Sequence, residues 1–136
     1  MANNSQPSQQ DTQKLIQQLN SGQLAQAAQT ANSLLIKHPN AFVLHHVLAL
    51  ALDGQQKFAD AVVSYQHAIK LQPNTADLYF NLGIALNHLN RFDEAINAYQ
   101  QAIRLQPKFF EAHGNLGTVL QRLGRLDDAV KSYRAG

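Results

Sequence analysis

The chain contains no cysteine, and charged residues make up only 15% of its 136 residues. The absence of cysteine excludes disulfide bonds and thiol chemistry. No apolar run approaches the roughly 20 residues that a membrane-spanning helix needs. The N-terminal MANNSQPSQQ lacks the basic and apolar regions of a secretory signal. We therefore expect a soluble, cytoplasmic protein that makes no contact with a membrane.

The charge balance also narrows the class of partner. The net charge is +2, and both signs are interspersed through the second half of the sequence. This distribution gives no basic patch of the kind that binds nucleic acid. The surface must be polar mainly through amides, because the chain has 17 glutamines and 11 asparagines. We therefore expect a protein or peptide partner and no nucleic acid.

What the sequence does have is an internal repeat with a period of 34 residues. Three columns of identical residues carry it: Ala27, Ala61, Ala95 and Ala129; Tyr65, Tyr99 and Tyr133; and Pro39, Pro73 and Pro107. A period of this length is typical of proteins built from stacked helical hairpins.

The best-formed repeat shows what each unit contains. Leu82, Leu86 and Leu89 recur at helical spacing, and the pattern breaks at Asn90. A second helical pattern then runs over residues 92–103. Pro107 ends it, because proline lacks a backbone donor and disfavours helical geometry in the preceding residue. Each unit is therefore predicted to be a helix, a tight turn, a helix and a proline stop.

This pattern resembles the tetratricopeptide repeat (TPR) family. The matching residues in the best unit are Tyr79, Leu82, Gly83, Leu86, Phe92, Ala95, Tyr99, Ala102 and Pro107. The resemblance covers about residues 8–136 and implies an all-α, right-handed α-solenoid of about three and a half to four helix-turn-helix units. We expect units at 8–41, 42–75, 76–109 and 110–136, with the last truncated, after a low-complexity polar tail at 1–7. Four antiparallel pairs, eight helices in all, are predicted.

The residues that invite a catalytic or metal-binding reading have structural explanations. The six histidines include no pair at the i, i+4 spacing with a third ligand that zinc requires. The pairs Asp93–Glu94 and Asp127–Asp128 share one repeat position, at the expected first turn of a second helix, where carboxylates stabilise the helix dipole. We therefore expect no metal, no cofactor and no enzymatic activity.

In TPR proteins the first helix of each unit lines a concave groove. The resemblance therefore implies a set of groove residues, which we call the inner-face residues. They are Val43, His46, Val47, Leu50, Asp77, Phe80, Asn81, Ile84, Asn87, His88, Glu111, Asn115, Thr118 and Arg122.

Two known uses of such a groove can be compared with these residues. Some TPR domains hold a C-terminal carboxylate with lysine, asparagine and arginine. The corresponding positions here are His46, Leu50, Asn81, Glu111 and Asn115. Two cations are missing and Glu111 would repel a carboxylate, so this use is rejected. The TPR regions of O-linked N-acetylglucosamine transferases hold peptide backbone with repeated asparagines, which Asn81 and Asn115 resemble at two positions. An amide suits this task because it both donates and accepts hydrogen bonds, although asparagine is also tolerated on any exposed helix face.

The sequence therefore predicts a scaffold that binds an extended or helical peptide segment with apolar content. Two alternatives remain open: the substrate-presenting N-terminal region of a larger enzyme such as a glycosyltransferase, and a self-associating assembly module. We also expect a homodimer, because Leu116, Leu120 and Tyr133 would lie on an open C-terminal face.

Overall fold

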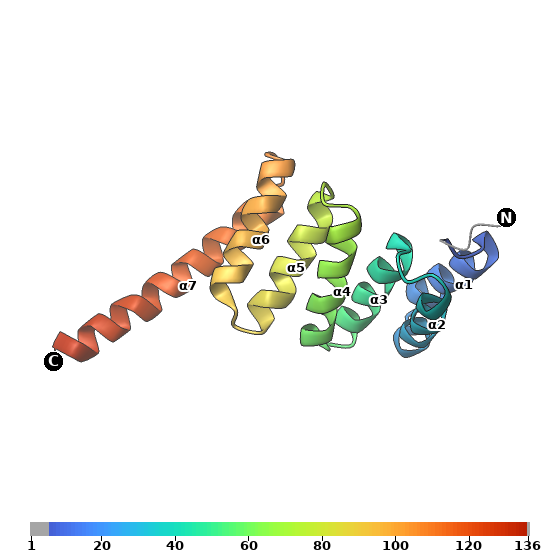
Figure 1. Ribbon diagram of the computed structural model, residues 1–136. Coiled ribbons are helices and arrows are strands. Elements are labelled where there is room, and N and C mark those ends of the chain that lie inside the picture. The colour runs from blue at the N-terminus through green and yellow to red at the C-terminus, as the bar shows by residue number, and fades with distance from the viewer. Residues whose placement is uncertain (1–5, 136) are drawn as a thin grey trace. The chain divides into compact units, whose positions relative to one another are not determined.

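The computed structural model describes residues 6–135, and for residues 127–135 only the path of the helix. This part of the chain contains seven helices and no strand (Figure 1), which confirms the all-α class. The helices are α1 (Gln9–Asn20), α2 (Leu24–Lys37), α3 (Phe42–Gly54), α4 (Phe58–Leu71), α5 (Ala76–His88), α6 (Phe92–Leu105) and α7 (Phe110–Ala135). None of these helices is long and apolar enough to cross a membrane.

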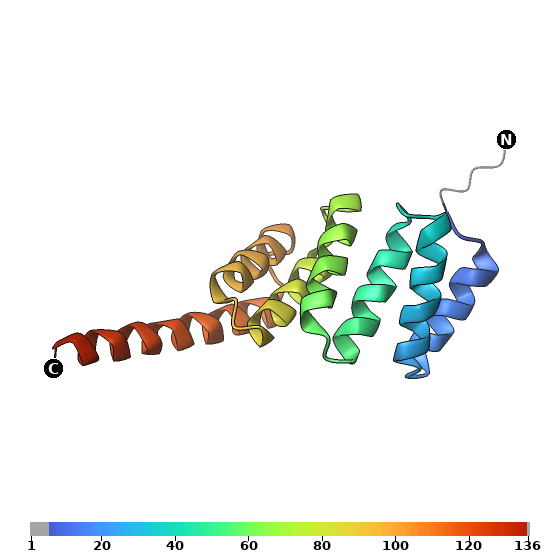
Figure 2. The same cartoon turned by 60° about the horizontal axis from the view of Figure 1, so that its bottom comes forward.

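The helices fall into two compact units, Met1–Asn74 and Thr75–Gly136, and each is described by itself. In the first unit α1 pairs with α2 and α3 pairs with α4, as both views show (Figure 2). Ser8 begins α1, because its side-chain oxygen accepts a hydrogen bond from the Asp11 backbone N–H at 3.1 Å. The core of this unit gathers Leu15 of α1, Ala27 of α2 and Leu44 of α3.

A single turn geometry joins the helices of each pair. The second residue after the first helix of each pair adopts a positive φ at Gly22 (81°), Gln56 (63°) and Asn90 (60°), which are 34 residues apart. The backbone N–H of the following residue donates to the carbonyl five residues earlier, at 2.9 Å in all three turns. This is a Schellman-type helix end, in which a left-handed residue reverses the chain. Glycine adopts this conformation most readily and asparagine next, so Gln56 is the least expected of the three.

The prolines end the second helices as predicted. The helices α2, α4 and α6 end two residues before Pro39, Pro73 and Pro107 respectively. The predicted small-residue columns are also buried, since Ala27, Ala61 and Ala95 have no exposed surface.

In the second unit, α5 and α6 form a hairpin that depends on one glycine. A Cβ built on Gly83 would lie 2.7 Å from Cε1 of Tyr99, closer than any ordinary contact. Glycine at position 83 therefore lets the tyrosine ring lie directly against the α5 backbone. The fully buried Leu78 and nearly buried Leu86 of α5 complete this packing.

The prediction of eight helices is wrong, because α7 is one continuous helix of 26 residues (Figure 1). Its residue 124 stands where the other repeats turn, yet Gly124 does not have a positive φ. The second helices α2 and α6 each pack against the first helix of the next repeat, α3 and α7, as well as their own partner. Among the described residues, a separate helix over residues 126–135 would have only one neighbouring helix, so less burial of apolar side chains would offset the cost of forming the turn. Asp127 and Asp128 consequently lie inside α7 and not at a helix start.

Candidate functional site

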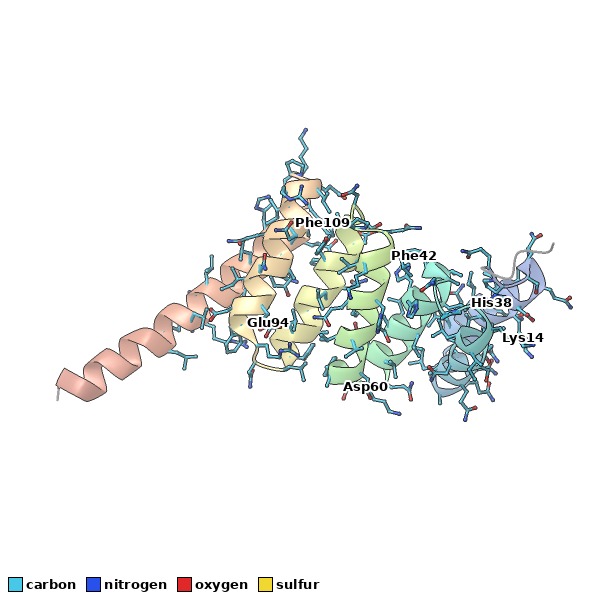
Figure 3. The ribbon with its side chains drawn as sticks, in the orientation of Figure 1. Lys14, His38, Phe42, Asp60, Glu94 and Phe109 are labelled. Carbon is cyan, nitrogen blue, oxygen red and sulfur yellow. The ribbon has the colours of Figure 1, made fainter. Side chains whose placement is uncertain are left out.

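The inner-face residues of α5 form a half-exposed surface in the second unit. Phe80, Asn81, Ile84 and Asn87 are all half-buried, in contrast to Leu82 on the opposite side of the helix, which is buried. Phe80 is held by two other rings: its centroid lies 4.7 Å from that of Phe109 and 6.1 Å from that of Tyr99. Figure 3 labels Phe109, which lies at the junction of α6 and α7. The ring of Phe80 therefore has a fixed position, although part of it remains accessible.

The asparagine of α7 is engaged within the protein. The Asn115 side chain hydrogen-bonds the hydroxyl of Tyr99, and this bond partly offsets the rise in the Tyr99 pKa that burial causes. Asn115 is half-buried. It therefore helps to fix Tyr99 in addition to any role toward a ligand, which the sequence pattern could not distinguish.

The Arg122 side chain also contacts another residue of the chain, whereas two carboxylates, one on α5 and one on α7, are exposed. The Arg122 guanidinium lies 5.9 Å from the centroid of the Phe92 ring, within the range of a cation–π contact. The Thr118 hydroxyl donates to the Gly114 carbonyl at 3.0 Å. Asp77 at the start of α5 and Glu111 at the start of α7 are both exposed. His88 is exposed at the other end of α5.

In the first unit, one predicted residue is not available to a ligand. Val47 is only 4% exposed, because α1 packs beside α3 and Val47 joins the core with Leu15. Val43, His46 and Leu50 are half-buried on α3. Val47 is therefore a core residue, and its prediction as an exposed inner-face residue is wrong.

The repeat positions of Asp53 and Asn87 differ in their hydrogen bonding. Tyr65 donates its hydroxyl hydrogen to Oδ2 of Asp53 at 2.7 Å in the first unit. At the corresponding position of the second unit, the Asn87 Oδ1 is buried and has no hydrogen-bond partner among the described residues. A buried acceptor without a partner is costly. Tyr65 and Tyr99 share one repeat column, and nothing in that column predicts the contacts of their hydroxyl groups.

Two histidines share a structural role. The Nε2 atoms of His45 and His113 lie 2.7 Å and 2.9 Å from the carbonyl oxygens of Pro39 and Pro107, the prolines that precede their helices. These contacts tie the start of α3 and of α7 to the preceding loop. In residues 6–126 no three histidine or carboxylate side chains are arranged to hold a metal ion.

Comparison with known proteins places this geometry among TPR structures. The first TPR of Spaghetti (RPAP3) bound to the HSP90 peptide SRMEEVD is 25% identical, with a TM-score of 0.79 over 84% of this chain and 90% of that one. The first TPR domain of human RPAP3 is 24% identical, with a TM-score of 0.77 over 87% and 93%. MamA from Desulfovibrio magneticus RS-1 is 22% identical, with a TM-score of 0.80 over 92% and 71%. The last two likenesses show the fold alone. No curated protein sequence matches.

A match to the sequence pattern of a known family identifies the family of this chain. The family model described as "TPR repeat" matches residues 54–88 and 85–124, which together span more than half of the chain. The finer resemblance to the TPR regions of O-linked N-acetylglucosamine transferases finds no support in these comparisons. The 34-residue columns, the Gly83–Tyr99 contact and this match agree, and the chain belongs to the tetratricopeptide repeat family.

Proposed function

We propose that the chain is a non-catalytic scaffold that binds a peptide segment of another protein. The observation that carries the proposal is the α5 surface: Phe80 and Ile84 stay partly exposed beside Asn81, although other apolar side chains of the same helix are buried. The similar TPR domain of Spaghetti, which was solved with an HSP90 peptide, supports a peptide as the ligand class.

The side chains around this surface favour an apolar peptide over an acidic one. The exposed carboxylates of Asp77 and Glu111 repel an acidic ligand, whereas Ile84 and Phe80 gain from burial. Asn81 adds an amide that can both donate to and accept from a peptide backbone. The ligand we propose is therefore an extended or helical segment with apolar side chains and no requirement for a C-terminal carboxylate.

Selection from a random peptide library on the immobilised protein tests this proposal. We expect enrichment of peptides with apolar side chains, and calorimetry with an enriched peptide should show at least a tenfold loss of affinity for Ile84→Lys. The matched control is Asn97→Lys, which adds the same charge on the exposed side of α6. Equal binding by both variants, with both folded by circular dichroism, would refute the α5 surface as the site.

The acidic peptide SRMEEVD provides a test of ligand chemistry. We expect weak binding to the natural sequence and tighter binding to Glu111→Lys, because the substitution turns a repulsive charge into an attractive one. Tight binding of SRMEEVD by the natural sequence would show that the inner-face carboxylates do not decide ligand choice.

A second candidate function is self-association through α7. The observation that favours it is the exposed apolar surface on this helix, where Leu120 and Leu126 are each 50% exposed and Phe110 is 75% exposed. Exposed apolar side chains of this kind mark a candidate interface. Sedimentation at rising concentration should show an increase in mass for the natural sequence and none for Leu120→Lys. A mass that stays monomeric at high concentration would exclude this function.

A further inference from the structure

Two carboxylates at the edge of the α5 surface have no cationic partner. Asp77 precedes Phe80 by three residues on α5, and Glu111 is the second residue of α7. Both side chains are exposed, and neither forms an ion pair or a hydrogen bond among the described residues. A carboxylate in the first turn stabilises the helix dipole, but α3 has Val43 at this repeat position and no acidic residue in its first turn. The repeat therefore does not require a carboxylate there.

The contacts at the starts of α5 and α7 bring these two carboxylates to one end of the α5 surface. Their alanine neighbours in the chain, Ala76 and Ala112, both pack into one apolar cluster with Phe109. Cα atoms of the two helices approach within 8 Å of each other. A cation placed between the two carboxylates is therefore attracted by both of them.

The cations on either side of Glu111 in the sequence do not neutralise it. Lys108 precedes Glu111 by three residues and is exposed, but the two side chains form no ion pair. Arg122 lies over the Phe92 ring, and eleven residues of helix place it roughly 16 Å from Glu111. At physiological salt that separation exceeds the Debye length of about 8 Å, so the attraction between the two charges is largely screened. A ligand at this end of the α5 surface therefore meets an excess of negative charge.

We infer that the peptide segment proposed above carries a lysine or arginine beside its apolar side chains, and that this cation binds between Asp77 and Glu111. The inference rests on the proposed peptide-binding function and adds the charge of the partner. Asp77, Phe80 and Ile84 follow one another at intervals of three and four residues, so they share one side of α5. The apolar side chains of the segment bury Phe80 and Ile84, and its basic side chain complements the carboxylates.

The length of α5 sets the spacing within such a segment. Seven residues of helix separate Asp77 from Ile84, which corresponds to roughly 10 Å along the helix axis. An extended peptide advances about 3.3 Å per residue. An extended segment that lies along α5 therefore places its basic residue about three residues from the apolar residue that contacts Ile84.

Selection from a random peptide library on immobilised proteins tests this inference. The natural sequence is compared with the double variant Asp77→Asn/Glu111→Gln. We expect the natural sequence to enrich peptides with a lysine or arginine about three residues from an apolar side chain. The double variant should enrich apolar peptides with no preference for basic ones. The matched control is Asp11→Asn/Asp60→Asn, which removes two exposed first-turn carboxylates from the other unit.

Calorimetry with a basic peptide enriched on the natural sequence gives the size of the effect. We expect at least a tenfold loss of affinity for Asp77→Asn/Glu111→Gln and less than a twofold change for Asp11→Asn/Asp60→Asn. Raising the salt from about 50 mM to about 500 mM should weaken binding to the natural sequence more than binding to the double variant, because salt screens exposed charges. Circular dichroism checks that both variants are folded.

The outcomes separate this inference from the proposed function. If the natural sequence enriches apolar peptides without basic residues, and Ile84→Lys abolishes their binding, the peptide-binding proposal stands and the inference about charge is overturned. Basic peptides that bind the double variant as tightly as the natural sequence would also overturn it, because another part of the chain would then recognise the charge. A library from which the natural sequence enriches no peptide would overturn both.

Discussion

Gly83 and Gly117 occupy the same repeat position, yet their surroundings differ. The Gly83 site is filled by the Tyr99 ring, whereas the Gly117 site is open. The same substitution should therefore have opposite effects at the two positions, although the sequence alone treats them as equivalent.

We expect Gly83→Ala to destabilise the second unit by about 1–3 kcal/mol, because the new methyl group would force the Tyr99 ring to move. Gly117→Ala should stabilise it by about 0.5–1 kcal/mol, because alanine favours a helix more than glycine does. Urea unfolding of both variants measures the difference. Equal destabilisation by both would mean that a partner fills the Gly117 space under the conditions used.

Tyr65 links stability to alkaline pH. Burial raises its pKa well above the ordinary value of 10, and the hydrogen bond to Asp53 and the charge of Asp53 raise it further. The unfolded chain therefore loses this proton at a lower pH than the folded chain. The stability that neutral Tyr65 contributes is complete below about pH 10 and falls as the pH rises beyond it.

We expect Tyr65→Phe to lower stability at neutral pH by about 1–3 kcal/mol, because Asp53 loses a hydrogen-bond donor. Above about pH 10, the stability of the variant should also fall less steeply than that of the natural protein. Thermal unfolding from pH 7 to pH 11 compares the two proteins. A natural protein whose melting temperature does not fall over this range would contradict the assignment.

At the level of whole helices, the burial of a side chain follows its repeat position wherever its helix has a neighbouring helix on both sides. Leu86 on α5 is 2% exposed, whereas Leu120, at the same repeat position on α7, is 50% exposed. The difference arises because α5 has α6 beside it and α7 has no second helix of its own repeat among the described residues.

Leu82→Ala should therefore cost about 2–5 kcal/mol, the range for emptying a core leucine site, and Leu120→Ala less than about 1 kcal/mol at low protein concentration. Chemical unfolding at a fixed, dilute concentration gives both values. A loss below about 0.5 kcal/mol for Leu82→Ala would show that its column is not a core column.

The sequence predicts six of the seven helices well, for identifiable reasons. Pro39, Pro73 and Pro107 mark helix ends through a local steric effect, and the alanine columns mark close helix contacts. The fourth hairpin was predicted from the column that ends in Tyr133, but α7 continues through Gly124. A hairpin depends on burial by the next neighbour, and repeat spacing carries no information about that neighbour.

The candidate site was less predictable for a similar reason. The repeat position placed Val47 on the inner face, but packing of α1 beside α3 buries it. The repeated asparagine predicts the same peptide-binding role for Asn81 and Asn115, although the Asn115 side chain is hydrogen-bonded to Tyr99. Contacts between helices decide whether such a residue is buried or hydrogen-bonded, and the residues near it in the sequence do not predict those contacts.

On the scale of the whole molecule, we propose that the chain binds a peptide through the inner-face residues of α5. The second helices of the repeats, α2, α4 and α6, also carry exposed side chains, including Val63 at 51% and Ile36 at 84%. A ligand that binds these second helices is therefore the competing possibility.

The most direct test is to map the binding of a library-selected peptide by amide chemical shifts of the isotope-labelled protein. We expect the largest shifts on α5 around Asn81 and Ile84, with further shifts near Glu111 of α7. Shifts concentrated around Ile36 on α2 or Val63 on α4, with α5 unperturbed, would contradict the account.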